Sequence, residues 1–309
     1  MQKVKFSVFS DIHIDEHWTS DGTDRLNAIL ARAKRENVDF IIDCGDFGYP
    51  SQIGRALDTY NNFEIPTYHV LGNHDLDKAT LDEAVKAFNM PNEYYYFDKN
   101  GFRFIALNEN YCRVDGEDIP YSMGNYFKMG EYRDYISKEQ IEWLYDVVMS
   151  SPYPMVIFSH GSLQLEDIYG DAVKNREDVQ NIFRKAHKNG KRILMCLNGH
   201  YHVDYMRIYE HVCYFDVNSA TMYWMSNTHD KFGEEFHKKH IGACHTVIYN
   251  DPLSAIVTLS EDGSIEIEGT ESSFYMGISK EDVSGNSCHN AIKCTPKIMS
   301  EKLRLPIEL

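Results

Sequence analysis

The sequence lacks the long apolar run that a membrane-spanning helix needs. None of its hydrophobic stretches approaches the roughly 18 consecutive apolar residues that would cross a bilayer. The start of the chain, MQKVKFSVFSDIH, passes directly into an alternating strand pattern, without an apolar segment followed by a small-residue cleavage site. The sequence therefore predicts no secretory signal and no membrane partner, and we expect a cytoplasmic protein.

Basic residues and cysteines are also scarce. The chain has 31 Lys and Arg against 47 Asp and Glu, so its net charge is −16. This balance argues against a partner held mainly by its phosphate backbone, such as DNA. The seven cysteines are an odd number, and Cys44 and Cys196 lie inside apolar runs, which indicates buried free thiols in a reducing compartment. Cys288 and Cys294 could pair, although two unpaired thiols are the simpler expectation.

Strand and helix patterns alternate through the first 90 residues. Val4, Phe6 and Val8 alternate with polar residues, as in a half-buried strand, and residues 38–44 and 67–71 are further apolar strand patterns. Residues 23–37 and 51–63 have helical periodicity, and Thr80 with Glu83 fits a capping box that starts a third helix. The order β-α-β-α-β-α implies a parallel sheet with helical crossovers.

The pattern is less regular after residue 90. A hairpin is expected around Asn100-Gly101, helices after Ser137 and before Gly190, and strands at residues 155–160, buried, and 192–200. From Val203 to Glu268 we expect mostly antiparallel strands. Since there is no internal repeat or low-complexity linker, residues 1–270 are predicted to form one domain and residues 271–309 a tail packed on it.

Polar residues suited to metal binding follow five of the predicted strands. In chain order they are Asp11 and His13, Asp46, Asn73 with His74, His160, and His200 with His202. In open α/β sheets, sites form at the carboxyl ends of the strands, so groups that are nearly 200 residues apart can converge in space. One such residue alone is most often a turn residue or a solvated polar group, but the whole set is not explained in that way.

Without His74, this set offers two aspartates, one asparagine and four histidines as ligands, and no thiolate. Seven ligands are too many for one tetrahedral zinc, and the set is too rich in nitrogen for calcium or magnesium. It suits two borderline divalent ions, such as manganese, iron or zinc, roughly 3.5–4 Å apart. A single carboxylate can bridge such ions, and Asp46 is the natural candidate because it comes alone after the central strand.

The motifs DIH, GD, GNHD, SH and GHYH, in this order and each at a predicted strand end, resemble those of the calcineurin-like metallophosphoesterases. The resemblance covers roughly residues 4–220. It implies an α/β fold of two packed mixed β-sheets flanked by helices, an α/β/β/α sandwich, and a metal-dependent phosphoric ester hydrolase. It also implies a ligand set for each of two cations: Asp11, His13, Asp46 and His202 for one, and Asp46, Asn73, His160 and His200 for the other.

The resemblance also gives a role to His74, which is then not a ligand. Asn73 binds through a neutral oxygen, so two aspartates against two divalent ions leave a formal surplus of about +2 that holds a phosphoryl group. His74 would face the substrate and stabilise or protonate the leaving oxygen. Asp75 is the expected orienting carboxylate, with Asp77 as the alternative.

The leading hypothesis is a hydrolase of a small phosphodiester or nucleotide-type phosphate ester, in which a hydroxide bridging the two cations attacks phosphorus. The alternatives are a phosphomonoesterase or nuclease of the same family, and a non-catalytic scaffold. The complete ligand set argues against the scaffold, and the acidic composition without a basic stripe argues against the nuclease.

Two long segments, residues 108–136 and 161–178, are predicted to wall the substrate pocket. They contain few cations, namely Arg113, Lys128, Arg133, Lys174 and Arg176, so we expect a small substrate rather than a polyanion. Several aromatic residues are either packing residues or platforms for a substrate ring: Tyr111, Tyr121, Tyr126, Tyr132, Tyr135, Tyr223 and Trp224. His229, His237 and His240 are a weaker hint of a third metal.

Overall fold

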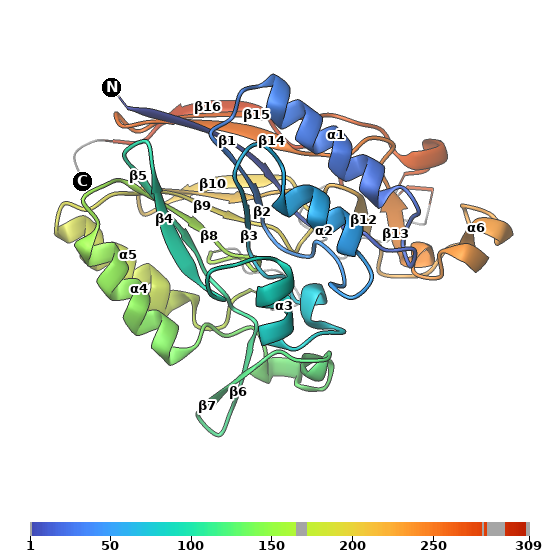
Figure 1. Ribbon diagram of the computed structural model, residues 1–309, viewed down its shortest axis with the longest axis horizontal. Coiled ribbons are helices and arrows are strands. Elements are labelled where there is room, and N and C mark those ends of the chain that lie inside the picture. Colours follow the sequence, from blue (N-terminus) through green and yellow to red (C-terminus); the bar gives the residue numbers. More distant parts are fainter. Residues whose placement is uncertain (1, 165–171, 280, 283–293, 307–309) are drawn as a thin grey trace.

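The computed structural model describes residues 2–164, 172–279, 281–282 and 294–306. Two six-stranded mixed sheets pack face to face, with helices over their outer faces, which confirms the expected fold class (Figure 1). The first sheet has the strand order β16 (Glu301–Arg304), β15 (Ser264–Gly269), β14 (Ala255–Ser260), β1 (Lys3–Phe9), β2 (Phe40–Asp43) and β3 (Thr67–His69). The second has the order β10 (Tyr205–Tyr209), β11 (Val212–Asp216), β9 (Ile193–Asn198), β8 (Met155–Phe158), β5 (Phe102–Ala106) and β4 (Tyr95–Lys99).

The first 90 residues form the predicted alternation of strands and helices. β1, β2 and β3 are parallel and are connected by α1 (Gly22–Arg35) and α2 (Gly54–Asn61). The short 3-10 helix η1 (His74–Leu76) and α3 (Leu81–Ala87) follow β3. Thr80 and Glu83 make the predicted capping box at the start of α3. This arrangement brings the carboxyl ends of the three strands to the same edge of the sheet.

The second sheet has a parallel centre with an antiparallel strand at each edge. β5, β8, β9 and β11 are parallel, while β4 and β10 pair antiparallel to their neighbours. The predicted hairpin turn between β4 and β5 has Asn100 at φ 49° and Gly101 at φ 79°, as a two-residue hairpin loop requires. Helices α4 (Lys138–Ser150), capped by Ser137, and α5 (Arg176–Lys188) cover the outer face.

The expectation of mostly antiparallel strands between Val203 and Glu268 is confirmed, with two departures. β11 runs parallel to β9, and the small helix α6 (Glu234–Lys239) interrupts this part of the chain. β12 (Met222–Trp224) pairs with β13 (Thr246–Ile248) in a separate two-stranded sheet, next to η4 (Ala243–His245). The strands β14 and β15 extend the first sheet antiparallel to β1, and β16 joins its edge.

Alternation along the strands divides their side chains between two cores. In β8, Val156 and Phe158 lie in the core between the sheets, whereas Met155 and Ile157 pack beneath α4 and α5. A strand buried on both faces is a continuous apolar run, as the sequence of this strand is. The polar residues directly after the strand are therefore the first that can contribute to a site at the edge of the sheet.

The long insert before α4 is a hairpin followed by two short turns. β6 (Tyr111–Val114) and β7 (Glu117–Pro120) form the hairpin, which projects from the body of the protein in Figure 1. The 3-10 helices η2 (Asn125–Lys128) and η3 (Gly130–Tyr132) follow, and another, η5 (Tyr275–Gly277), lies after β15.

None of the helices in the described parts of the chain combines the length and the apolar character needed to span a bilayer. Cys44, Cys112, Cys196, Cys213 and Cys244 are free thiols, and Cys288 lies outside the described residues.

Candidate metal centre

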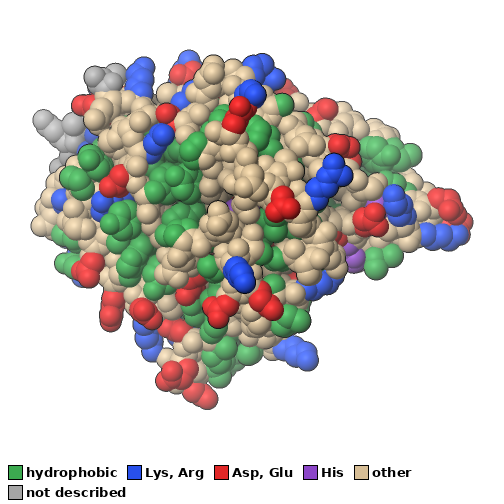
Figure 2. Space-filling view, viewed as in Figure 1, with side chains coloured by type: hydrophobic (Ala, Val, Ile, Leu, Met, Phe, Trp, Pro, Cys, Tyr) green, Lys and Arg blue, Asp and Glu red, His purple; other side chains and the backbone are tan. Residues whose placement is uncertain are grey.

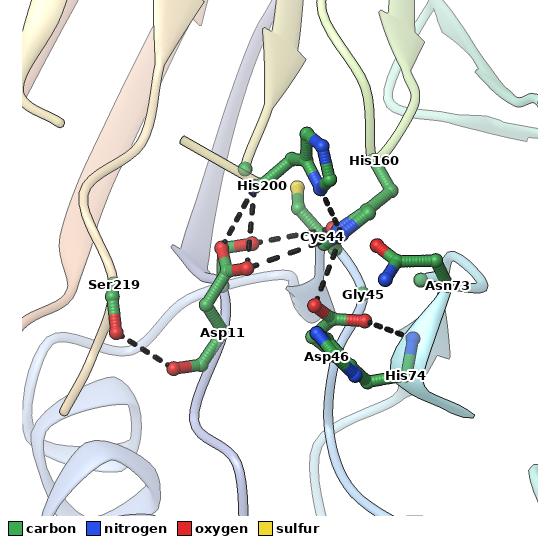
Figure 3. Close-up of polar contacts among 12 residues, drawn as sticks. Asp11, Cys44, Gly45, Asp46, Asn73, His74, His160, His200 and Ser219 are labelled. Carbon is green, nitrogen blue, oxygen red and sulfur yellow. Dashed lines mark hydrogen bonds and ion pairs between the residues drawn. The ribbon is translucent and has the colours of Figure 1, made fainter. Parts of the chain in front are cut away.

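The predicted metal-binding residues lie together at one edge of the sandwich, in the loops after β1, β2, β3, β8 and β9 (Figure 3). Two clusters could each hold a cation: a first cluster of Asp11, His13 and His202, and a second cluster of Asp46, His160 and His200. Within each cluster the ligand atoms all lie within 4.8 Å of one another. Residues from both sheets therefore meet at one point.

Asp46 lies between the two clusters. Its Oδ2 atom is 3.2 Å from Nε2 of His160 and 3.8 Å from Nε2 of His13. Burial acts to raise the pKa of Asp46, but the neighbouring His160 and His74 bring it well below the usual range. An ionised carboxylate thus lies within reach of imidazoles from both clusters.

The hydrogen bonds of the histidines leave nitrogen lone pairs for a cation. Nδ1 of His160 is 2.8 Å from the Cys44 carbonyl, and Nδ1 of His202 is 2.7 Å from the Met222 carbonyl. Because a carbonyl only accepts, both Nδ1 atoms carry the proton, and Nε2 is the nitrogen of each ring that would bind metal.

Asn73 also has a polar atom that is suited to a cation. Its Nδ2 donates to the hydroxyl of Tyr126 at 3.0 Å, while its buried Oδ1 has no hydrogen-bond partner. Such an atom costs free energy unless something binds it. The donor set therefore fits a pair of divalent cations with nitrogen and oxygen ligands.

The backbone of this site is strained at most of the ligand positions. Positive φ angles are found at Asp11 (51°), His13 (46°), Asp46 (55°), His200 (70°) and His202 (54°). This region costs a non-glycine residue roughly 1–2 kcal/mol. Backbone hydrogen bonds hold the strained loops, from Asp11 N to the Gly45 carbonyl at 2.9 Å and from His13 N to the Asp46 carbonyl at 3.0 Å. Strain that clusters in this way is typical of a functional site.

Glycines are needed where these loops touch. A Cβ on Gly45 would lie 2.5 Å from Nδ1 of His160, and one on Gly72 would lie 2.2 Å from the backbone nitrogen of Asp46. A side chain at either position would displace a candidate ligand. These two glycines therefore set the distances within the second cluster.

The carboxylate that contacts His74 is Asp77, not Asp75. Nδ1 of His74 lies 2.8 Å from Oδ2 of Asp77. Asp75 is fully buried and accepts hydrogen bonds from the backbone nitrogens of Asp46, Gly48 and Gly72. The expectation for the orienting carboxylate was therefore wrong, and Asp75 instead supports the loop that carries Asp46.

His74 remains partly exposed and its surroundings favour a positive charge. Burial acts to lower its pKa, but the Asp46 carboxylate and the hydrogen bond with Asp77 raise it to about 9. A histidine in this state carries a proton on each ring nitrogen, and the Nε2 proton is not used by Asp77.

Tyr126 is a supporting residue whose role the sequence did not reveal. Its hydroxyl accepts the hydrogen bond from Asn73 and donates to Oδ1 of Asp77 at 2.6 Å. The ring is buried and stacks on Tyr121, with centroids 4.4 Å apart. One residue of the insert thus contacts both a candidate ligand and the partner of His74.

Glu109 is a second residue that sequence reasoning missed. Its Oε1 accepts a hydrogen bond from the nitrogen of Gly161, directly after His160, and its buried Oε2 has no hydrogen-bond partner. Burial raises its pKa to about 7. It lies in the loop after β5, where the sequence LNENYC has no ligand-type motif that would draw attention to it.

Most of the aromatic residues of the insert are packing residues. Tyr111 binds Glu93, Tyr121 binds Asp134 and Tyr135 lies under Arg113, while Tyr132 is 53% exposed. Tyr223 is fully buried. Part of the second predicted wall, residues 165–171, lies outside the described residues.

The proposed third histidine group does not converge in the described parts of the chain, where only the two clusters above meet the distance test. His229 binds the Thr246 carbonyl through Nε2, and His240 binds the Glu16 carbonyl through Nδ1. These two side chains are held by backbone carbonyls in different places.

Known proteins share this fold and motif set. A family model described as calcineurin-like phosphoesterase matches residues 4–204. A manganese-dependent ADP-ribose/CDP-alcohol diphosphatase of Oryza sativa subsp. japonica is 24% identical over 221 residues, which is 57% of this chain and 68% of that protein.

Two solved structures show the same architecture. A dimetal phosphatase from Danio rerio superposes with a TM-score of 0.61 at 16% identity and covers 88% of this chain and 98% of its own. GAP50, described as the anchor in the inner membrane complex of Plasmodium, has a TM-score of 0.55 at 12% identity over 99% of this chain and 90% of its own. These two likenesses establish the fold. The match of the family model to most of the sandwich, together with the two clusters, shows that the chain belongs to the calcineurin-like phosphoesterases and is a metal-dependent phosphoric ester hydrolase.

Proposed function

We propose that the protein hydrolyses a small phosphodiester or nucleotide-type phosphate ester with two divalent cations, one in each cluster. The observation that carries the proposal is the position of Asp46, whose Oδ2 lies within 4 Å of imidazole nitrogens from both clusters. A shared carboxylate is the usual way in which a protein holds two cations close together.

The two cations have separate sets of ligands that share Asp46. Asp11, His13, Asp46 and His202 hold one, and Asp46, Asn73, His160 and His200 hold the other. When bound, the cations supply positive charge for the phosphoryl group and activate water. Manganese, iron and zinc all suit these ligands, and the name of the rice relative favours manganese.

His74 acts as the general acid. Asp77 fixes the ring through Nδ1, so the proton on Nε2 is the one available to the leaving oxygen. The raised pKa supports a protonated ring at neutral pH before the reaction. After the proton has moved to the leaving group, the ring recovers one from water.

The charges around the site favour a small substrate. Arg113 is paired with Asp118 at 2.6 Å and Arg133 with Asp134 at 3.2 Å, so these two cations of the insert are partly neutralised. On the face drawn in Figure 2, Lys and Arg are scattered among Asp and Glu rather than gathered in a stripe. A polynucleotide would need such a stripe, whereas one or two phosphates on an organic group would be held by the cations themselves.

The test is a substrate panel on metal-free protein reloaded separately with Mn²⁺, Fe²⁺ and Zn²⁺. The panel contains bis(nitrophenyl) phosphate, nitrophenyl phosphate, ADP-ribose, a CDP-alcohol and single-stranded DNA. We expect at least one small diester or nucleotide diphosphate to be hydrolysed best, and the Asp46→Asn variant to be inactive on all of them. Faster hydrolysis of the monoester or of DNA would overturn the proposed substrate class.

A further inference from the structure

The indole N–H of Trp224 is hydrogen-bonded to a histidine nitrogen that a cation of the first cluster would need as a ligand. Its indole Nε1 lies 3.0 Å from Nε2 of His202. An indole N–H can only donate, so Nε2 of His202 accepts it through its lone pair, while Nδ1 donates to the Met222 carbonyl. Oδ1 of Asp11 lies 3.2 Å from the same Nε2 atom. One lone pair holds one partner, and therefore the indole N–H and a cation exclude each other at this atom.

The indole ring lies beside both the first cluster and the proposed acid. Its centroid is 5.2 Å from the ring of His202, 5.9 Å from that of His13 and 6.4 Å from that of His74. The edge of Trp18 packs against it at 4.9 Å, which limits how far the ring can turn away. Any phosphoryl group that reaches both the first cation and His74 must pass close to this ring.

We propose that Trp224 is a substrate-binding residue, whose N–H covers His202 in the metal-free chain and donates to a phosphoryl oxygen of the substrate once a cation holds His202. This inference rests on the proposed function. A partly buried N–H that loses its acceptor must find another one or pay its desolvation. An anionic oxygen is the strongest acceptor available there, because a hydrogen bond to a charged group is worth more than one to a neutral group.

A chain in which Trp224 is the only tryptophan tests both parts of the proposal without turnover. The protein has three tryptophans, and Trp18→Phe with Trp143→Phe removes the other two. The probes are Zn²⁺, a d¹⁰ ion without redox chemistry, and inorganic phosphate. We expect the emission of Trp224 to shift as Zn²⁺ is added, and to shift again with phosphate only in the zinc-loaded protein. No shift with zinc at saturation would overturn the covering role, and no second shift with phosphate would overturn the donor role.

Trp224→Phe then removes the N–H while keeping an aromatic ring. We expect the first-cluster cation to bind about 2- to 10-fold more tightly, because its competitor is gone, and inorganic phosphate to inhibit about 10-fold more weakly. Trp18→Phe is the matched control, since it alters the same aromatic contact and leaves the N–H of Trp224 in place. Equal effects of the two variants would mean that packing alone matters and would overturn the proposal.

The outcomes separate this inference from the proposed function. If the wild-type protein hydrolyses no phosphate ester with any cation while the emission shifts persist, the proposed function fails and the binding role of Trp224 stands. If the wild-type protein is active and Trp224→Phe changes neither metal affinity nor phosphate inhibition, only the role of Trp224 fails. If Trp224→Phe does not fold, the emission shifts of the single-tryptophan protein still test the role of Trp224.

Discussion

The two clusters have the same kinds of ligand but different surroundings. Every residue of the first cluster is buried, and Trp224 with Trp18 packs against it. In the second cluster His200 is partly exposed. Its supports are polar: Tyr126 holds Asn73, and Glu109 binds the backbone directly after His160.

Because of this difference, we expect the two clusters, the two halves of the metal centre, to hold their cations in different ways. An apolar wall excludes water and strengthens electrostatic interactions, so a cation in the first cluster should be held in one place. Hydrogen bonds from the insert, residues 108–136, connect the second cluster to the segment that is proposed to contact the substrate. If so, changes at Asp46 should affect both halves, and changes at Tyr126 should affect mainly one.

The largest effect is expected for Asp46→Ala, which removes the carboxylate that both halves share. Both cations should be lost or greatly weakened together, and the rate should fall by more than the roughly 10²–10⁴-fold of a single acid–base group. His202→Ala is the control that should affect mainly the first cation. Elemental analysis of the purified variants measures this, and two metals retained by Asp46→Ala would rule out the bridging assignment.

A large loss without loss of metal is expected for His74→Ala. The rate should fall by roughly 10²–10⁴-fold with both metals retained, because the ring donates a proton but binds no cation. The loss should be smaller for substrates with good leaving groups, such as nitrophenol. Asp77→Asn should show the same dependence more weakly, and equal losses for good and poor leaving groups would contradict the acid role.

A moderate effect confined to the second half is expected for Tyr126→Phe. Without the hydroxyl, the amide of Asn73 loses the hydrogen bond that turns its Oδ1 towards the cluster, which should cost about 10- to 100-fold in metal affinity or activity. The matched control is Tyr121→Phe, since that hydroxyl binds Asp134 and its ring lies in the same stack. If Tyr126→Phe also lost the cation of the first cluster, the two clusters would not bind their cations independently.

The smallest effect is a pH dependence from Glu109 beneath the second cluster. Burial raises the pKa of Glu109 from its usual 4.5 to about 7. Its contribution to the stability of the metal-free protein is therefore complete below pH 4.5 and is lost as the pH rises through 7. Glu109→Gln keeps an acceptor for Gly161 and should raise the free energy of unfolding by about 3 kcal/mol at pH 8 but not at pH 4.

Denaturant unfolding of metal-free protein at several pH values measures this difference. Glu64→Gln, which removes an exposed carboxylate paired with Lys34, is the control and should change little at any pH. An unfolding free energy that shifts equally at both pH values would mean that folding does not change the pKa of Glu109.

The sequence was most informative where apolar strands ended in polar residues. Asp, Asn and His are costly within a strand buried on both faces unless they are hydrogen-bonded, as Asp43 and Asn198 are here. A group of such residues directly after an apolar strand therefore marks the sheet edge where the loops converge. That is why the motifs from Asp11 to His202 located the site. The partner of His74 was the exception, although helical geometry could have found it: in η1, residues three apart face each other and adjacent ones do not, which favours Asp77 over Asp75.

The insert could not be understood from the sequence in the same way. If residues 108–136 only form the predicted pocket wall, removing residues 112–134 should raise the KM for the true substrate and affect the turnover of an aryl phosphate less. Tyr126 changes that expectation, because its loss would also disturb Asn73 and Asp77. Phe127→Ala is a better test of the wall, since this side chain is 61% exposed.

The strained loops have a consequence for the evolution of related sequences. Five candidate ligands occupy backbone conformations that glycine or asparagine would adopt at lower cost. Asp and His tolerate this region better than most side chains, but glycine adopts it at the lowest cost. A duplicate copy released from catalysis should therefore drift at these positions towards glycine and asparagine and become more stable as it does. Among related genomes, the residues at positions 11, 13, 46, 200 and 202 would then separate working enzymes from copies that have kept only the fold.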